Sequence, residues 1–127
     1  MNILIAGGGI AGLTAALSLA RQGFSVELFE RSPLIEEIGA GLQISPNGAR
    51  LLYRLGLKDD LDACAFQPAS LNLRLGQSGT PIFSIPMREH ALRAYDAPYL
   101  HLHRADLVRV LLDALCADPR VSIHLES

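Results

Sequence analysis

The stretch Ile5-Ala-Gly-Gly-Gly-Ile-Ala-Gly-Leu13 places four glycines within six positions, between two apolar runs near the start of the chain. Three of these glycines, Gly7, Gly9 and Gly12, have the spacing G-x-G-x-x-G, and the acidic residue Glu30 follows roughly twenty residues later. The spacing is informative where a strand precedes it and a helix follows it, and both conditions are met here. The stretch therefore predicts a strand, a tight turn and a helix.

Each glycine of this spacing has a physical role in a turn that binds a dinucleotide. Gly7 permits the tight turn, Gly9 lets a pyrophosphate approach the backbone, and Gly12 allows the helix to pack closely on the strand. The N–H groups of Ile10 and Ala11 and the positive end of the helix dipole attract the phosphates. The turn is thus predicted to hold an adenine dinucleotide.

Glu30 restricts which dinucleotide fits this turn. Its carboxylate can accept hydrogen bonds from the hydroxyls of the adenosine ribose, and its charge repels a 2′-phosphate. FAD and NAD therefore fit better than NADP, and the turn does not choose between these two. The alternative is a glycine-rich packing turn with a surface glutamate.

The first thirty residues favour a Rossmann-like βαβ unit, so the fold class is α/β with a parallel sheet. The apolar run at residues 3–5 predicts an interior strand covered on both faces, and residues 24–30 alternate as a second strand. A membrane segment at residues 3–20, which carry no charge, is disfavoured because adjacent glycines would weaken a helix. The helix between the strands ends at Gly23, and its apolar positions are Leu13, Ala16, Leu17 and Ala20.

The middle of the chain departs from this alternation of strands and helices. Residues 31–41 predict a loop and 42–44 a short strand, and a helix then runs from Pro46 to Gly56 with Leu51, Leu52 and Leu55 on one face. Residues 71–85 predict a β-hairpin, and a polar connector follows it.

The last third of the chain predicts a strand, a helix and a strand. The helix ends at Asp118-Pro119, and its apolar stripe comprises Leu107, Val108, Leu111, Leu112 and Leu115. The chain contains no internal repeat or flexible linker.

Composition excludes several classes of partner. The 127 residues fit one domain, and the net charge of −2 has no basic block, so we expect neither nucleic acid nor a membrane as partner. Cys64 and Cys116 are far apart among apolar neighbours, which predicts buried, reduced thiols and a cytoplasmic setting.

Three stretches together resemble one family: GGGIAGLTAALSLARQGFSVELFERS, EIGAGLQISPNGARLLYRLGL and LHLHRADLVRVLL. They are similar to the N-terminal part of the FAD-dependent single-component aromatic hydroxylases, which include salicylate, 3-hydroxybenzoate and 6-hydroxynicotinate monooxygenases. The resemblance implies tightly bound FAD, NAD(P)H as co-substrate, and O2 with a small aromatic substrate. It favours FAD over the NAD-dependent dehydrogenase that the glycine turn alone would allow.

The resemblance also implies roles for four residues outside the glycine turn. Glu30 would bind the adenosine ribose and Arg31 would lie near the adenine and pyrophosphate. Gln43 would lie close to the flavin, and Arg104 would reach the cofactor from the start of its helix, for which a guanidinium is well suited. The alternatives are a strand-end amide for Gln43 and a solvated first-turn residue for Arg104.

No residue is assigned as a catalytic acid or base, and no metal site is predicted. His101 and His103 are two residues apart and would share one face of a strand, but a third ligand is missing.

The family proteins are much longer than this chain, so we expect an N-terminal portion of an FAD-binding domain that is inactive by itself. The hairpin at 71–85 would belong to the substrate domain, and a missing C-terminal half would leave apolar surface that favours self-association. A non-catalytic dinucleotide-binding module remains the alternative.

Overall fold

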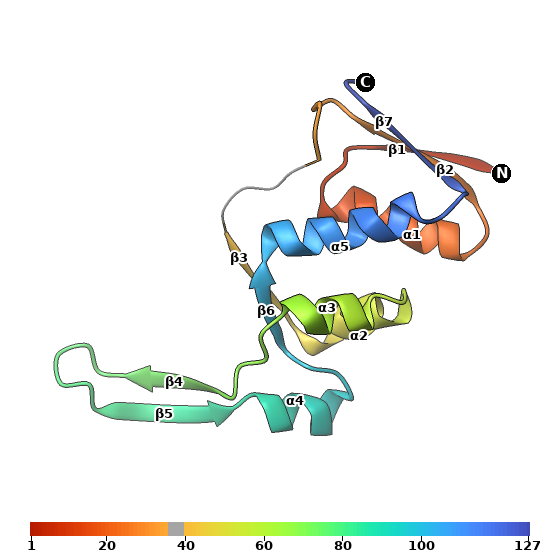
Figure 1. Cartoon of the computed structure of the whole chain (residues 1–127). Helices are drawn as coiled ribbons and strands as arrows, with labels where there is room; N and C mark the ends of the chain where they lie inside the picture. The colour runs from red at the N-terminus through yellow and green to blue at the C-terminus, as the bar shows by residue number, and fades with distance from the viewer. Residues whose placement is uncertain (36–39) are drawn as a thin grey trace.

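The computed structural model describes residues 1–35 and 40–127 of the chain, and it begins with a βαβ unit. Strand β1 (Asn2–Ala6) leads through the glycine turn into helix α1 (Ile10–Arg21). Strand β2 (Ser25–Glu30) then returns and pairs parallel with β1 (Figure 1). The strand, turn and helix predicted from the glycine spacing are therefore present.

Helix α1 buries the side that its sequence predicts. Gly23 follows the helix with a φ of +91°, a conformation that L-residues with side chains rarely adopt. Glycine therefore ends the helix, and the chain turns back into β2. The fully buried residues of α1 are Leu13, Ala16, Leu17 and Ala20.

A second helix and strand extend the parallel sheet. Helix α5 (Arg104–Cys116) leads into β7 (Val121–Leu125), which pairs parallel with β2 and gives the order β1-β2-β7. Helices α1 and α5 pack against each other and lie side by side in Figure 1. The fold is thus α/β with a parallel sheet, as predicted. The stripe of α5 is buried at Leu107, Val108, Leu111 and Leu115.

Strand β1 is not the interior strand that its apolar run predicts. Within the described part of the chain β1 pairs with β2 alone, so it forms an edge of the sheet. The side chain of Leu4 on this strand is 67% exposed. An apolar run indicates that a strand suits a covered position, but it does not indicate which segment covers it.

A second, smaller sheet lies beyond the two packed helices. Strand β3 (Gly41–Ile44) pairs antiparallel with β6 (Leu100–His103), with Gln43 opposite His101. The parallel sheet therefore does not extend into this region. The loop predicted before β3 includes residues 36–39, which lie outside the described residues.

Helix α2 (Pro46–Arg54) follows β3 and begins at the predicted proline. Its buried face differs from the prediction, because Leu52 is buried while Leu51 is 59% exposed. Ala49 lies one turn before Leu52 and takes the second buried position. Leucine spacing alone misplaced the face, since adjacent leucines on a helix point in different directions.

Two helices were missed by the sequence patterns. Helix α3 (Lys58–Cys64) buries Leu61, and helix α4 (Arg88–Tyr95), which the sequence predicted as a polar connector, buries Ala91. Each helix therefore offers one buried residue and lacks the apolar stripe that a periodicity argument requires.

The cysteines are also less buried than predicted. Both are free thiols, but Cys64 is half-buried and Cys116 is exposed. Burial raises the pKa of the Cys64 thiol.

Strands β4 (Ser70–Arg74) and β5 (Pro81–Pro86) form the predicted hairpin, which projects away from the helices in Figure 1. Every residue of both strands is exposed. The large apolar side chains of the hairpin are 42% to 53% exposed, and they are Leu71, Leu73, Leu75, Ile82, Phe83 and Ile85. A lone two-stranded hairpin with such a surface is suited to pack against another surface.

None of the helices in the described ranges, 1–35 and 40–127, is long and apolar enough to cross a membrane.

Asp118 joins three elements at the end of α5. Its side chain is 2% exposed and accepts hydrogen bonds from Nε of Arg120 at 3.0 Å and from Nη2 at 3.2 Å. Nη1 of Arg21, at the end of α1, lies 3.9 Å away. The side-chain hydrogen bond from Arg120 is the main cause that lowers the pKa of Asp118 below its usual 3.8. The buried carboxylate thus fixes the entry into β7.

We expect the substitution Asp118→Asn to lower the free energy of unfolding by about 1–3 kcal/mol at neutral pH, because a charge-assisted set of hydrogen bonds is lost. A carboxylate with a lowered pKa stabilises the fold above its unfolded pKa, and this contribution disappears as the pH falls through the folded value. Urea unfolding should therefore show a difference between wild type and variant that shrinks below pH 3.8. An equal difference at every pH would contradict this role for the charge.

We also expect the chain to self-associate through the apolar face of the hairpin. Leu73 and Phe83 are cross-strand partners on that face, so the double substitution Leu73→Lys and Phe83→Lys should shift the chain to monomer. The matched control changes the neighbouring pair Asn72 and Ser84 to lysine, which adds the same charge to the other face. Size-exclusion chromatography with light scattering measures the mass, and a monomeric wild type would contradict the expectation.

Candidate functional site

The turn between β1 and α1 is fixed to β2 by a backbone hydrogen bond. The N–H of Gly7 donates to the carbonyl oxygen of Phe29 at 2.7 Å. Gly7 has a φ of +105°, which lies in the region that favours glycine. The tight turn predicted at this position is therefore present, and it needs a residue without a side chain.

Gly12 is required by packing. A Cβ atom added at Gly12 would lie 1.9 Å from the carbonyl oxygen of Gly7, a backbone atom that cannot move aside without breaking the turn. The first turn of α1 thus rests directly on the turn that precedes it. This is the close approach that the sequence predicts for the third glycine of the spacing.

Gly9 differs from both of these glycines. Its φ is −75°, which any residue adopts, and no described atom lies within 4 Å of a Cβ added there. Neither backbone strain nor packing within the described structure therefore requires glycine at this position. The space beside the Gly9 backbone is open to a ligand.

The start of α1 supplies hydrogen-bond donors beside this space. The helix begins at Ile10, and the described residues provide no side-chain cap and no acidic residue in its first turn. The N–H groups of Ile10 and Ala11 have no partner within the helix, because the first turn of a helix lacks preceding carbonyl groups. Such donors at the positive end of a helix favour an anion.

Glu30 lies at the end of β2, next to the glycine turn. Its Oε2 accepts a hydrogen bond from the N–H of Gly8 at 2.6 Å, and its Oε1 accepts one from the N–H of Ser32 at 2.9 Å. The backbone hydrogen bond from Gly8 is the main cause that lowers the pKa of Glu30. The carboxylate is therefore ionised at neutral pH, and each of its oxygens can accept a further hydrogen bond.

Gly8 is a site residue that the sequence reasoning missed. A Cβ added there would lie 3.1 Å from Oε2 of Glu30 and 3.0 Å from Cδ1 of Ile35. The fourth glycine therefore lets the carboxylate approach the turn. The available signal was the extra glycine inside the G-x-G-x-x-G spacing.

Helix α5, whose first residue is Arg104, begins on the same side of the molecule as the glycine turn. Helices α1 and α5 pack side by side, and both begin on that side in Figure 1. The N–H of Arg104 donates to the carbonyl oxygen of Ala40 at 3.0 Å, just before β3. The start of α5 is thus held next to the strand that carries Gln43. Arg31 is exposed and directly follows Glu30.

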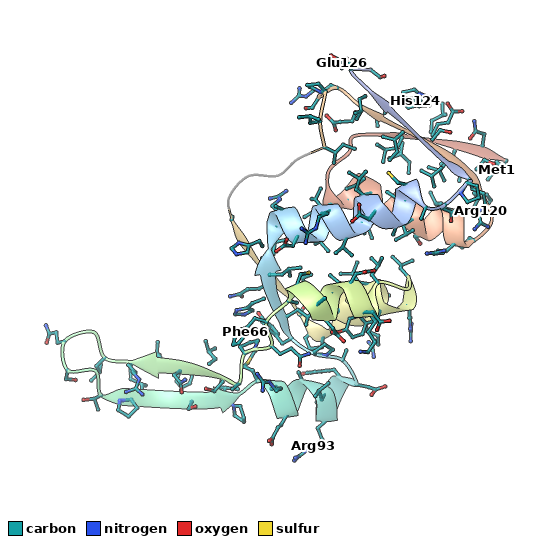
Figure 2. All side chains as sticks on the ribbon, viewed as in Figure 1. Met1, Phe66, Arg93, Arg120, His124 and Glu126 are labelled. Atoms are coloured by element: carbon teal, nitrogen blue, oxygen red, sulfur yellow. The ribbon has the colours of Figure 1, made fainter. Side chains whose placement is uncertain are left out.

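Gln43 lines a cavity of about 420 Å³ on the face of the β3–β6 sheet. Its Oε1 accepts a hydrogen bond from the hydroxyl of Tyr99 at 3.0 Å, a partner that the sequence gave no means to find. His101 and His103 line the same cavity, which agrees with their predicted common face. Phe66 closes another side and is labelled in Figure 2, where the chain leaves α3 for the hairpin.

The predicted residues thus fall into two groups. The first group surrounds the start of α1 and comprises Gly7, Gly9, Ile10, Ala11, Gly12, Glu30 and Arg31. The second group, Gln43 and Arg104, lies at the β3–β6 sheet and the start of α5. In residues 1–35 and 40–127, no cluster of three or more histidine, cysteine or acidic side chains could hold a metal ion.

Comparisons with known proteins agree with this geometry. Residues 2–41 match the family model described as FAD dependent oxidoreductase. The chain is 41% identical over 117 residues to 3-amino-4-hydroxybenzoate 2-monooxygenase of Streptomyces cremeus, covering 92% of this chain and 30% of that protein. It is 34% identical over 114 residues to 6-hydroxynicotinate 3-monooxygenase of Pseudomonas fluorescens, covering 90% of this chain and 30% of that protein.

The chain is homologous to FAD-dependent aromatic monooxygenases. Among solved structures, it superimposes on the tetrameric form of 2-methyl-3-hydroxypyridine-5-carboxylic acid oxygenase with a TM-score of 0.84 and 28% sequence identity. That match covers 99% of this chain and 31% of the other chain. The chain therefore spans about 30% of the length of these monooxygenases.

The different roles of Gly9 and Gly12 predict that the same substitution destabilises the fold by different amounts at the two positions. Gly12→Ala should lower the free energy of unfolding by about 1–3 kcal/mol, because the added methyl group meets the backbone of Gly7. Gly9→Ala should lower it by less, by about 0.5–1 kcal/mol, because the methyl group enters open space and only the preference of the N-cap position for glycine over alanine is lost. Urea unfolding followed by circular dichroism measures both, and equal losses would contradict the assignment.

Proposed function

We propose that this chain forms the FAD-binding part of a monooxygenase that uses NAD(P)H and O2 to hydroxylate a small aromatic substrate. The observation that carries the proposal is the open space at Gly9, beside the N–H groups at the start of α1 that have no partner within the helix. Glycine is not needed there by the fold, so a ligand that touches the backbone explains it best. A pyrophosphate is such a ligand, since it accepts several hydrogen bonds and is attracted by the helix dipole.

Glu30 and Arg31 would bind the adenosine end of FAD. The ionised carboxylate of Glu30 retains acceptor capacity for the ribose hydroxyls, in addition to the two N–H groups that hold it. Arg31 directly follows it and is exposed, so its guanidinium can approach the adenine and the pyrophosphate. The charge of Glu30 disfavours a 2′-phosphate, which supports FAD over NADP as the bound nucleotide.

Arg104 and Gln43 would lie toward the flavin. Both helices of the packed pair begin on one side, so a dinucleotide held at α1 can extend toward the start of α5. The cavity beside Gln43 provides room for part of a ring system. When bound, FAD supplies the electron transfer from NAD(P)H to O2 that ring hydroxylation requires. The residues of this chain bind and orient the cofactor, and none of them is assigned as a catalytic acid or base.

The rest of the proposal concerns the longer protein. The hairpin at 71–85 would contribute its apolar face to a substrate domain, which would explain why that face is exposed in this chain. The chain alone is then inactive, because it spans about 30% of the length of its relatives. The two free thiols suit a cytoplasmic protein.

The proposal is tested by titrating FAD against the chain while following flavin fluorescence. We expect saturable binding that Gly9→Val weakens by about a hundredfold or more, because the side chain occupies the space meant for the pyrophosphate. Glu30→Ala should weaken FAD binding less and should raise the affinity for NADP, because the repelling charge is removed.

The matched control is Gly76→Val in the hairpin, since an added Cβ also meets open space there. This control should bind FAD as the wild type does, and circular dichroism should show all variants folded. Unchanged FAD affinity in a folded Gly9→Val variant would contradict the proposed site.

A further inference from the structure

Tyr99 contacts two side chains that line the cavity on the face of the β3–β6 sheet. Its hydroxyl donates a hydrogen bond to Oε1 of Gln43 at 3.0 Å, and its ring meets the ring of His101 edge to face, with centroids 5.5 Å apart. Of these three described residues, Gln43 and His101 line the cavity and Tyr99 does not. Tyr99 therefore stands behind the cavity wall and can affect a ligand there through the side chains that it contacts.

The backbone that carries Tyr99 is anchored on both sides. Leu100, the next residue, is fully buried and pairs with Ile44 of β3. On the other side of β6, His101 exchanges two backbone hydrogen bonds with Phe66, at 2.7 Å and 2.8 Å. Strand β6 thus lies between two partners, so the segment that presents the hydroxyl of Tyr99 is held in place.

Gln43 is less constrained than Tyr99. Its strand has four residues and, within the described part of the chain, pairs with β6 alone. The side chain is exposed, and within residues 1–35 and 40–127 its amide is bonded to the hydroxyl of Tyr99 alone. An exposed glutamine populates several rotamers and loses conformational entropy when a ligand orders it. The hydrogen bond from Tyr99 removes part of that freedom before a ligand binds.

The direction of this hydrogen bond also selects which atoms of the Gln43 amide a ligand meets. The amide oxygen is the acceptor for Tyr99, so the two N–H donors of the same amide remain available. An amide held in this way favours a ligand that carries an acceptor, such as a ring carbonyl oxygen. The isoalloxazine ring of FAD carries carbonyl oxygens of this kind.

We propose that Tyr99 is a positioning residue that orders the amide of Gln43 as a hydrogen-bond donor for the bound flavin. The inference rests on the proposed function in taking FAD as the ligand beside Gln43. Tyr99 acts through Gln43 and takes no part in the reaction itself. The anchored strand β6 thus fixes a side chain on the less constrained strand β3.

The first test is an FAD titration of the whole chain, followed by flavin fluorescence. Tyr99→Phe keeps the ring and removes the hydroxyl, and we expect it to weaken FAD binding by about threefold to tenfold. Tyr95→Phe is the matched control, because it removes the hydroxyl of a tyrosine that is 52% exposed on α4. This control should leave the affinity unchanged. Equal losses in the two variants, or no loss in a folded Tyr99→Phe variant, would overturn the inference.

A double-mutant cycle shows whether Tyr99 acts through Gln43. Gln43→Met keeps the length of the side chain and removes the amide, so it should weaken FAD binding at least as much as Tyr99→Phe does. In the Gln43→Met background, Tyr99→Phe should cause no further loss, because the hydroxyl then has no amide to order. The absorption bands of the bound flavin should shift alike in the two single variants. Additive losses would show that Tyr99 acts independently of Gln43 and would contradict the positioning role.

The chain without FAD provides a further measurement. Nuclear magnetic relaxation of the Gln43 side-chain amide should show restricted motion in the wild type and greater motion in Tyr99→Phe. Equal mobility in the two proteins would refute the ordering of the amide.

These measurements separate the inference from the proposed function. If FAD binds to the wild type and Tyr99→Phe changes neither the affinity nor the mobility of the amide, the positioning role fails alone. If FAD does not bind to the folded wild type, the proposed function fails and the flavin is lost as the ligand. The ordering of Gln43 by Tyr99 is then decided by the relaxation measurement.

Discussion

The hydrogen bond from the N–H of Gly7 to the carbonyl oxygen of Phe29 joins the first turn to the second strand, and the rest of the site depends on it. With the turn held there, the carboxylate of Glu30 accepts a hydrogen bond from the N–H of Gly8. This second hydrogen bond also holds the turn to the end of β2. Helix α1 must then start directly above the turn, which is why Gly12 has no room for a side chain. Gly7 and Gly12 are thus required by the protein itself and Gly8 leaves room for the Glu30 carboxylate, whereas neither backbone strain nor packing explains Gly9.

The packing of α1 against α5 fixes the position of the glycine turn relative to the second group of candidate site residues. Both helices bury apolar faces in the same core, and both begin on one side of the molecule. The antiparallel pair β3–β6 is attached there through the start of α5, so Gln43 and Arg104 are held relative to the turn although the chain between them is long. At the other end, Asp118 fixes α5 to β7 and to α1. The distance between the two groups of candidate site residues is therefore set by helix packing.

The exposed parts of the molecule differ in character. The hairpin presents apolar side chains on a surface that lies away from the helices, and β1 exposes Leu4 at the edge of the parallel sheet. Apolar surfaces of this kind are suited to contact with further protein. The cavity beside Gln43 is instead concave and partly polar, which suits small ligands.

The amino-acid sequence by itself determined the glycine turn, helices α1 and α5, the hairpin and the homology to flavin monooxygenases, because these depend on local spacing and on residue types at fixed positions. Tertiary structure alone decided three further features. It placed β1 at an edge, since strand order arises from contacts between distant segments. It decided helices α3 and α4, because each buries one residue and so has no stripe of apolar residues in the sequence. It also brought Tyr99 to Gln43, because a hydrogen bond between side chains 56 positions apart leaves no trace in spacing along the chain.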